Sequence, residues 1–194
     1  MIRKYLNQFY GENPRKSSDY ARIINANHFN RLQALLKGGE VIIGGQCDAQ
    51  DLYMAPTVIA DLFWDDPVMQ TEIFGPILPV IEFEDLSEVI SIINARPKPL
   101  ALYIFSSRPE SCRKVIDEVS FGTGCINDTV VQFANPHLPF GGVGSSGIGR
   151  YHGRASFEVF SNKKSVLKKS FAFDPPLRFP PYKNKLPILK KILR

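Results

Sequence analysis

The chain has 194 residues, of which 44% are hydrophobic and 22% charged, with 24 Lys and Arg against 19 Asp and Glu. These fractions are typical of a globular protein and exclude global disorder, a collagen-like repeat and a small disulfide scaffold. The net charge of +5 is uneven, because residues 1–162 carry 14 basic and 18 acidic side chains (net −4) and residues 163–194 carry ten basic and one acidic (net +9).

The first forty residues predict two helices and a strand. Residues 1–11 resemble the end of a helix whose beginning is missing. Ser17, Ser18 and Asp19 offer N-caps for a second helix with apolar positions from Ile23 to Leu36, which Gly38 and Gly39 would close. Residues 40–44 then predict a short strand.

The central region predicts alternating strands and helices. Strands are expected at 57–60 and 77–81, the second bent or at a sheet edge because it contains Pro79. A helix with capping-box spacing follows from Asp85 to Pro97. The remaining expected elements are a strand at 101–105, a helix from Pro109 to Val119 and a strand at 123–127. This order favours an α/β fold with a parallel sheet.

The last segment, residues 163–194, differs in composition from the rest. Five of the 15 prolines fall there together with clustered lysines, which predicts an extended arm rather than a second domain. We therefore divide the chain into 1–162 and 163–194. Residues 183–194 mix leucine and isoleucine with basic residues, a pattern suited to a partner protein's groove or an anionic membrane surface, with the groove favoured at this length.

Three cysteines, Cys47, Cys112 and Cys125, form no CxxC pair, which predicts free thiols in a reducing compartment. The beginning of the chain has no apolar run of the signal-peptide kind, so we expect a cytoplasmic location. Cys125 lies in a predicted strand, where a small buried residue is the ordinary role, rather than beside an activating base. No spacing of His and Cys predicts a metal site.

A glycine-rich run spans residues 139–149, and Gly142, Gly144 and Gly147 spell G-x-G-x-x-G with Glu158 downstream. A dinucleotide fingerprint requires a strand directly before its glycines. Pro136 and Pro139 precede these glycines and argue against a strand. The run instead predicts a sharply turning backbone that passes close to another segment.

Residues 72–76 (EIFGP) are a second candidate site. In an extended segment Glu72 and Phe74 project to the same side, where a carboxylate and a ring suit ribose hydroxyls and a flat ligand. The alternative is a surface glutamate and a core phenylalanine before a turn, which spacing alone favours.

Several long strings resemble the NAD(P)-dependent aldehyde dehydrogenases, and in particular their class 3 branch of fatty and aromatic aldehyde enzymes. The resemblance covers nearly the whole chain and is carried by residues 10–12, 22–24, 28–29, 53–57, 67–70, 72–76, 98–103, 138–147, 151–153, 156–157 and 178–182.

The resemblance implies the fold of that family's catalytic domain, incomplete at its N-terminus and followed by an extended arm, and it implies roles for matching residues. Glu72 would bind the nicotinamide-ribose hydroxyls of NAD or NADP, and Phe74 would lie against the cofactor. Phe140, Tyr151 and His152 would line the aldehyde pocket, with residues 129–133 as pocket sequence that varies within the branch.

The resemblance also implies what is absent. The family's cysteine nucleophile, its general base, its oxyanion asparagine and its dinucleotide fold match sequence before Met1, so no catalytic residue is expected here. We expect the C-terminal two-fifths of an aldehyde oxidoreductase, which is inactive alone and binds no cofactor by itself.

Two other hypotheses have different consequences. The first alternative to a piece of an aldehyde-oxidising enzyme is a non-catalytic product. Such a product would bind a complementary N-terminal chain or a second copy of itself, since the resemblance implies a family of homo-oligomers. Nucleic-acid binding through the basic arm is not expected, because the lysines lack interleaved stacking aromatics.

Overall fold

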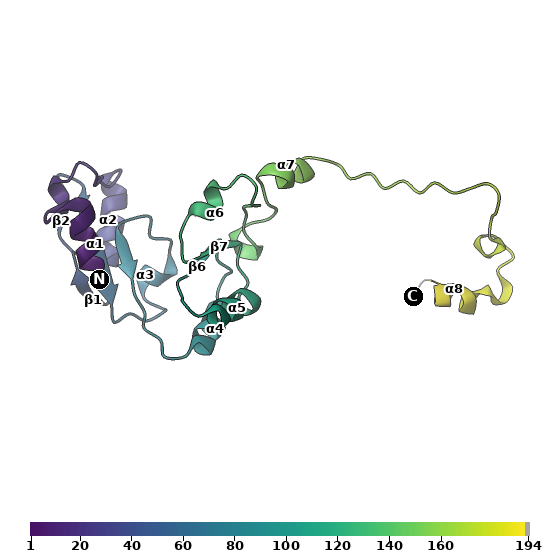
Figure 1. Cartoon of the computed structure of the whole chain (residues 1–194), viewed down its shortest axis with the longest axis horizontal. Coiled ribbons are helices and arrows are strands. Elements are labelled where there is room, and N and C mark those ends of the chain that lie inside the picture. Colours follow the sequence, from purple (N-terminus) through teal and green to yellow (C-terminus); the bar gives the residue numbers. More distant parts are fainter. Residues whose placement is uncertain (193–194) are drawn as a thin grey trace. The chain divides into compact units, whose positions relative to one another are not determined.

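The computed structural model describes residues 1–192. Its contacts divide the chain into a first unit, Met1–Ile92, and a second unit that begins at Ile93. Figure 1 labels the elements along the chain. The elements of the first unit are α1 (Ile2–Tyr10), a 3₁₀ turn at Pro14–Lys16, α2 (Ala26–Leu35), β1 (Glu40–Ile43), β2 (Cys47–Asp48), β3 (Tyr53–Met54), β4 (Thr57–Ala60), α3 (Pro67–Gln70), β5 (Ile77–Pro79) and most of α4 (Leu86–Asn94).

The first unit contains a three-stranded sheet in the order β1-β4-β5. Strands β4 and β5 are parallel, as the sequence predicted, and Pro79 lies on the edge strand where its missing N–H costs least. Strand β1 is antiparallel to β4, and β2 and β3 form a separate antiparallel pair. The α/β fold is therefore confirmed, with a mixed sheet in this unit instead of a purely parallel one.

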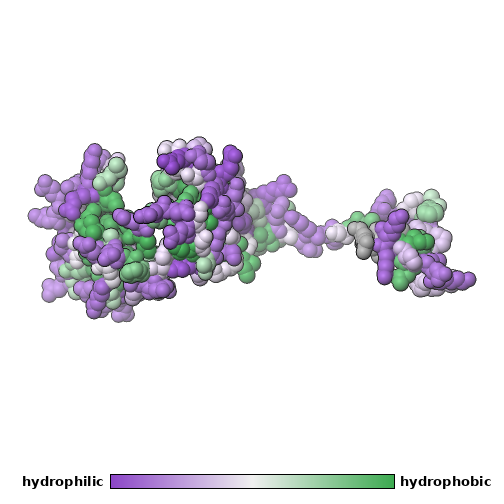
Figure 2. All heavy atoms as spheres, turned by 90° about the horizontal axis from the view of Figure 1, so that it is seen from below, coloured by the Kyte–Doolittle hydropathy of each residue, from purple (hydrophilic) through white to green (hydrophobic). Residues whose placement is uncertain are grey.

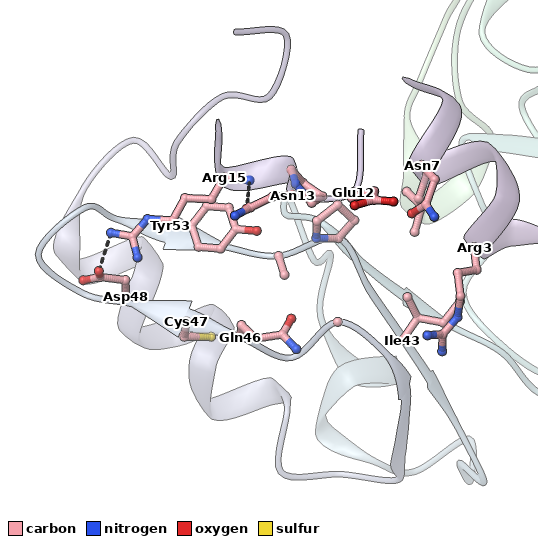
Figure 3. A pocket seen from close by; sticks show the side chains of 15 residues that line it. Arg3, Asn7, Glu12, Asn13, Arg15, Ile43, Gln46, Cys47, Asp48 and Tyr53 are labelled. Carbon is pink, nitrogen blue, oxygen red and sulfur yellow. Dashed lines mark hydrogen bonds and ion pairs between the residues drawn. The ribbon is translucent and has the colours of Figure 1, made fainter. Parts of the chain in front are cut away.

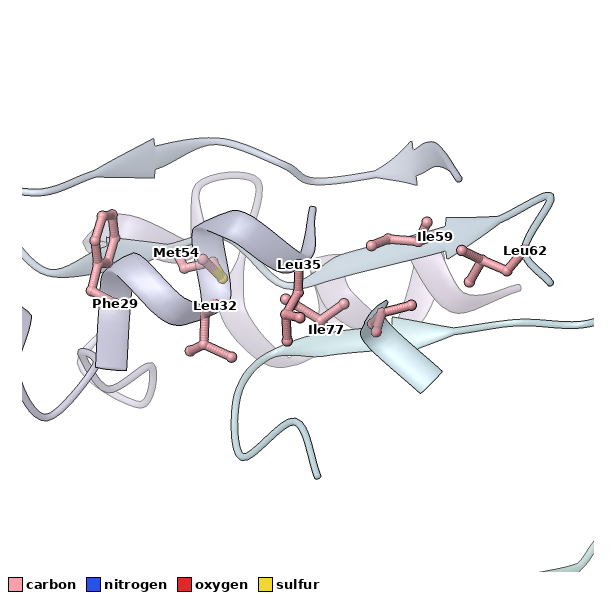
Figure 4. Close-up of a cluster of buried hydrophobic side chains, with 8 residues drawn as sticks. Phe29, Leu32, Leu35, Met54, Ile59, Leu62 and Ile77 are labelled. Atoms are coloured by element: carbon pink, nitrogen blue, oxygen red, sulfur yellow. The ribbon is translucent and has the colours of Figure 1, made fainter. Parts of the chain in front are cut away.

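Helix α2 packs on this sheet through one face. Phe29, Leu32 and Leu35 recur at three-residue spacing, and each is buried. Figure 4 shows Leu35 close to Ile77 of β5, and Ile59 of β4 belongs to the same cluster. The other members of the cluster are Met54, Leu62 and Val68. This core fixes the position of α2 relative to the loop that enters β5.

The predicted start of α2 was wrong. Ser17 accepts a hydrogen bond from the Asp19 N–H in a turn, and the N-cap is Asn25, whose side chain accepts from the His28 N–H at 2.8 Å. The segment between them is not helical, because its residues contact a distant part of the chain. The Ile23 N–H donates to the Leu52 carbonyl at 2.9 Å, and Arg22 pairs with Asp51. The helix therefore begins after these contacts, at the N-cap Asn25.

Replacing the N-cap tests this assignment. Asn25→Ala is expected to destabilise the chain by about 1 kcal/mol, because the His28 N–H loses its partner at the helix end. Urea unfolding followed by circular dichroism measures the change. Ser18→Ala is the matched control, and an equal loss in that variant would restore the earlier helix start.

The second unit contains a parallel two-stranded sheet, as predicted. Strand β6 (Ala101–Ile104) pairs in register with β7 (Thr123–Ile126), and α5 (Pro109–Glu118) connects them. Pro109 lies in the first turn of α5, where its missing N–H leaves no hydrogen bond unmade. The remaining elements are α6 (Val131–Ala134), a 3₁₀ turn at Gly144–Ser146, α7 (Gly153–Val159), 3₁₀ turns at Pro176–Arg178 and Lys183–Lys185, and α8 (Leu186–Ile192).

The segment that follows α7 has no helix or strand until Pro176. Its large apolar side chains, among them Leu167 and Phe171, are almost fully exposed. The boundary at residue 162 remains a prediction, and the last two residues of the predicted amphipathic segment lie outside the described part of the chain. Among residues 1–192, no helix combines the length and apolar character that a membrane crossing needs.

Candidate functional site

Glu72 and Phe74 lie in the loop between α3 and β5, where they face an open cavity of about 630 Å³ that Arg22, His28 and Arg31 also line. Both side chains are exposed, Phe74 to 73%. The interpretation of Phe74 as a core residue, which spacing favoured, is therefore wrong. The loop is not an extended strand either, since Phe74 has a φ of 47°.

The backbone of Phe74 is strained. A side chain other than glycine in the left-handed region costs about 1–2 kcal/mol, and bulky residues seldom adopt it. Such strain persists only where surrounding contacts hold it, and it is concentrated at functional sites. An exposed carboxylate and an exposed ring on one held loop form a surface that can accept hydroxyl hydrogen bonds and cover a flat ligand.

Phe140, Tyr151 and His152 come together in the second unit. Phe140 and Tyr151 exchange two backbone hydrogen bonds of 2.9 Å, which bring together the two ends of the glycine-rich run. The ring centroids of Tyr151 and His152 lie 4.3 Å apart, and those of Phe140 and Tyr151 lie 5.7 Å apart. Phe133 completes the cluster, with its centroid 5.4 Å from that of Phe140.

The cluster has two further marks of a binding surface. His152 has a φ of 85°, and Val130, the residue before α6, has a φ of 65°, which is unusual for a β-branched residue. The His152 Nδ1 atom is buried and has no hydrogen-bond partner among the described residues. An unpaired buried polar atom is costly and therefore rare in folded proteins. The sequence predicted three of the aromatic residues but placed Phe133 only within a variable stretch.

The glycine-rich run forms a 3₁₀ turn and not a strand–turn–helix. This agrees with the prediction that it is no dinucleotide fingerprint, and Glu158 pairs instead with Arg154 and Lys163. The predicted close approach is present. A side chain on Gly122 would place its Cβ 2.5 Å from the carbonyl oxygens of Gly141 and Leu100, so the run lies directly against the start of β7.

The three cysteines are free, and each lies in a setting that does not activate it. Cys112 is buried in α5, and burial raises the pKa of the Cys47 thiol. The Cys125 Sγ donates to Oε1 of the buried Gln132 at 2.8 Å, and this neutral amide cannot remove the thiol proton. Among residues 1–192, no group of three or more His, Cys, Asp and Glu side chains is arranged to hold a metal ion.

Another cavity, of about 610 Å³, lies between the 3₁₀ turn Pro14–Lys16 and the β2–β3 pair (Figure 3). Arg15 donates to Asp48 at 2.6 Å and pairs with Asp51, and its guanidinium lies over the Tyr53 ring. The Gln50 N–H and the Arg15 guanidinium lower the pKa of the Asp48 carboxyl. Arg15 thus forms ion pairs with both Asp48 and Asp51, which indicates a structural role in holding the β2–β3 hairpin.

The sequence pattern of the aldehyde dehydrogenase family matches residues 2–166 of the chain. Aldehyde dehydrogenase family 3 member B1 from Rattus norvegicus is 48% identical over 186 residues, which are 95% of this chain and 40% of that protein. A structure described as the substrate-bound state of Staphylococcus aureus AldH superposes with a TM-score of 0.82 at 45% identity, covering 100% of this chain and 43% of that one.

A more distant structure shares the fold as well. Succinic semialdehyde dehydrogenase from Streptococcus pyogenes, in complex with NADP+ as the cofactor, has a TM-score of 0.69 at 29% identity and covers 80% of this chain and 35% of that one. The chain spans about two-fifths of the length of the curated relatives it matches.

Proposed function

Since the chain belongs to the aldehyde dehydrogenase family, we propose that it is the C-terminal portion of an enzyme that oxidises aldehydes to carboxylic acids with NAD(P)+. The observation that carries this proposal is the pair of surfaces described above. One presents Glu72 and Phe74, and the other presents Phe140, Tyr151 and His152. The class 3 relatives, at 45–48% identity, support the same branch for this chain.

The residues of the first surface fit a nicotinamide cofactor. Glu72 presents an exposed carboxylate that accepts hydrogen bonds from ribose hydroxyls, and the exposed Phe74 ring offers a flat apolar face. When bound, NAD(P)+ supplies the acceptor for the hydride that leaves the substrate. The contribution of this chain is to bind and orient the nicotinamide-ribose half of the cofactor.

The second surface fits the aldehyde. The rings of Phe133, Phe140 and Tyr151 supply an apolar wall, and the His152 ring packs against that of Tyr151. In the family a cysteine thiolate attacks the aldehyde and a glutamate activates water. We propose that both belong to the sequence that the matched relatives carry before this region. The free cysteines support a reducing, cytoplasmic setting.

A second candidate function, association with a complementary N-terminal chain, rests on the sheet of the second unit. That sheet has only two parallel strands among the described residues, and parallel sheets are normally larger and covered on both faces. Tyr103, Phe105, Ile116 and Ile126 on or beside it are exposed. Figure 2 shows hydrophobic side chains exposed between hydrophilic ones on the face of the molecule that is drawn there. A monodisperse monomer in size-exclusion chromatography with light scattering, unchanged by an added N-terminal portion, would contradict association.

A substitution of Glu72 tests the cofactor role. In the enzyme assembled from this chain and the N-terminal portion of a class 3 relative, Glu72→Gln is expected to weaken NAD(P)+ binding about tenfold, because charged hydrogen bonds contribute roughly 1.5–3 kcal/mol. Fluorescence titration with NADH and NADPH measures the affinity. Glu84→Gln, another exposed carboxylate of the first unit, is the control, and equal affinities for both variants would remove Glu72 from the cofactor site.

A further inference from the structure

One face of α2 contacts the backbone of the loop that carries Glu72 and Phe74. His28, Arg31 and Leu32 lie at the three- and four-residue spacing that places side chains on the same side of a helix. Each of them contacts a different part of residues 72–75. The contacts engage carbonyl groups and the Cα of a glycine, so they act on the course of the chain and leave the Glu72 and Phe74 side chains exposed.

Two polar side chains hold three successive carbonyl oxygens. Arg31 donates from Nη1 to the Glu72 carbonyl at 3.3 Å and from Nη2 to the Ile73 carbonyl. The Nε2 atom of His28 lies 2.6 Å from the Phe74 carbonyl oxygen. Because the guanidinium donors form a rigid planar fork, two adjacent carbonyls can be held at once.

The same contacts determine the protonation of His28. A carbonyl oxygen only accepts, so Nε2 must carry a hydrogen. The Nε and Nη2 atoms of Arg31 each lie 3.4 Å from Nδ1 of His28, and a guanidinium only donates, so Nδ1 must be the acceptor. The geometry requires a neutral imidazole protonated on Nε2. The other charged groups around this ring, Arg22 and Glu72, line the same cavity.

The apolar contact lies beneath the same loop. A Cβ on Gly75 would lie 2.6 Å from both methyl groups of Leu32, so the backbone at Gly75 rests directly on this fully buried side chain. Phe74, which precedes Gly75 and carries the last of the three held carbonyls, is the residue with a φ of 47°. Its strained conformation is thus fixed from both sides, which is how such strain is maintained.

We propose that His28 and Arg31 are a positioning pair that holds residues 72–74 in the conformation presenting Glu72 and Phe74 to the cofactor. This proposal rests on the proposed function only for the identity of the ligand, the cofactor that Glu72 and Phe74 would contact. The loop order that the pair maintains is a property of the chain without any ligand.

Nuclear magnetic resonance on the ¹⁵N-labelled chain tests the proposal directly. The imidazole ¹⁵N shifts of His28 are expected to show a protonated Nε2 and an unprotonated Nδ1 at neutral pH. In His28→Leu and Arg31→Ala, the order parameters of the amides of residues 73–75 are expected to fall from about 0.85 to below about 0.6. In His28→Gln they are expected to stay high, because the amide offers one donor and one acceptor in place of the two ring nitrogens.

The controls separate positioning from folding. Asn30→Ala changes an exposed residue of the same helix and is expected to leave the loop unchanged. The amides of Ile59 and Ile77 report whether the core survives in each variant.

Each outcome decides the proposal. High loop order in His28→Leu and Arg31→Ala, or a proton on Nδ1 of His28 at neutral pH, would overturn it. These measurements need no cofactor, so they remain valid if NAD+ and NADP+ fail to bind the assembled enzyme. That failure would count against the proposed function and leave the positioning pair standing.

Discussion

The purified chain is expected to form no NADH or NADPH when mixed with an aldehyde and NAD+ or NADP+. The family's reaction needs a thiolate nucleophile, and none of the chain's thiols is placed to become one. Cys112 is buried, and burial raises the pKa of the Cys47 thiol. The Cys125 thiol donates a hydrogen bond to the neutral side-chain amide of Gln132. Enzymes accelerate such reactions by at least about 10⁶-fold, so the loss is expected to be complete within detection.

Complementation makes this result informative. The assay follows the absorbance of the reduced cofactor, first with the chain alone and then with an added N-terminal portion of a class 3 relative. Activity that appears only in the mixture supports a shared active site. Turnover by the chain alone would contradict the prediction, and Cys125→Ser in that case would show whether this thiol is responsible.

Leu32→Ala is expected to destabilise the chain by about 3 kcal/mol, within the 2–5 kcal/mol usual for deleting a large core side chain. Leu32 is fully buried at the centre of the cluster that joins α2 to β4 and β5. It also supports the backbone at Gly75, so the substitution leaves a cavity beneath the loop of Glu72 and Phe74. A loss of this size is a large part of the 5–15 kcal/mol that stabilises a typical domain.

Urea unfolding followed by circular dichroism measures the change. Gln33→Ala, on the exposed side of the same helix, is the matched control and is expected to shift the free energy of unfolding by less than about 0.5 kcal/mol. A loss below about 1 kcal/mol in Leu32→Ala would show that the site collapses without a cavity, and that Leu32 does not support the loop.

Local patterns predicted much of the secondary structure. The strand at 57–60 matches β4 at both ends, and the strand–helix–strand order from 101 to 127 matches β6, α5 and β7. These segments combine short apolar runs with strong boundary signals such as Pro109, so neighbours in sequence suffice to define them. The start of α2 failed for the opposite reason. The Ile23–Leu52 hydrogen bond, distant in sequence, holds the segment after the predicted caps out of the helix, and no local pattern indicates that bond.

The candidate site shows the same division. Motif resemblance predicted Glu72, Phe74, Phe140, Tyr151 and His152, and the structure brings the last three together in one cluster. It placed Phe133 in the pocket only as part of the variable stretch 129–133, without singling it out. An H-x-x-R pattern on one helix face was visible at His28 and Arg31, but a helix face alone does not reveal what it contacts.

The sequence by itself determined the family, the α/β class and the approximate bounds of the elements it predicted apart from the start of α2, because these depend on motifs and on periodicities of a few residues. It did not predict the short elements β2, β3, α3, α6 and α7. Only the tertiary structure decided that Phe74 is exposed and strained, that β1 runs antiparallel to β4, and that α2 holds the loop before β5. Each of these outcomes is a competition between contacts more than ten residues apart in sequence. Such contacts depend on which groups find partners after packing, and no local pattern records that.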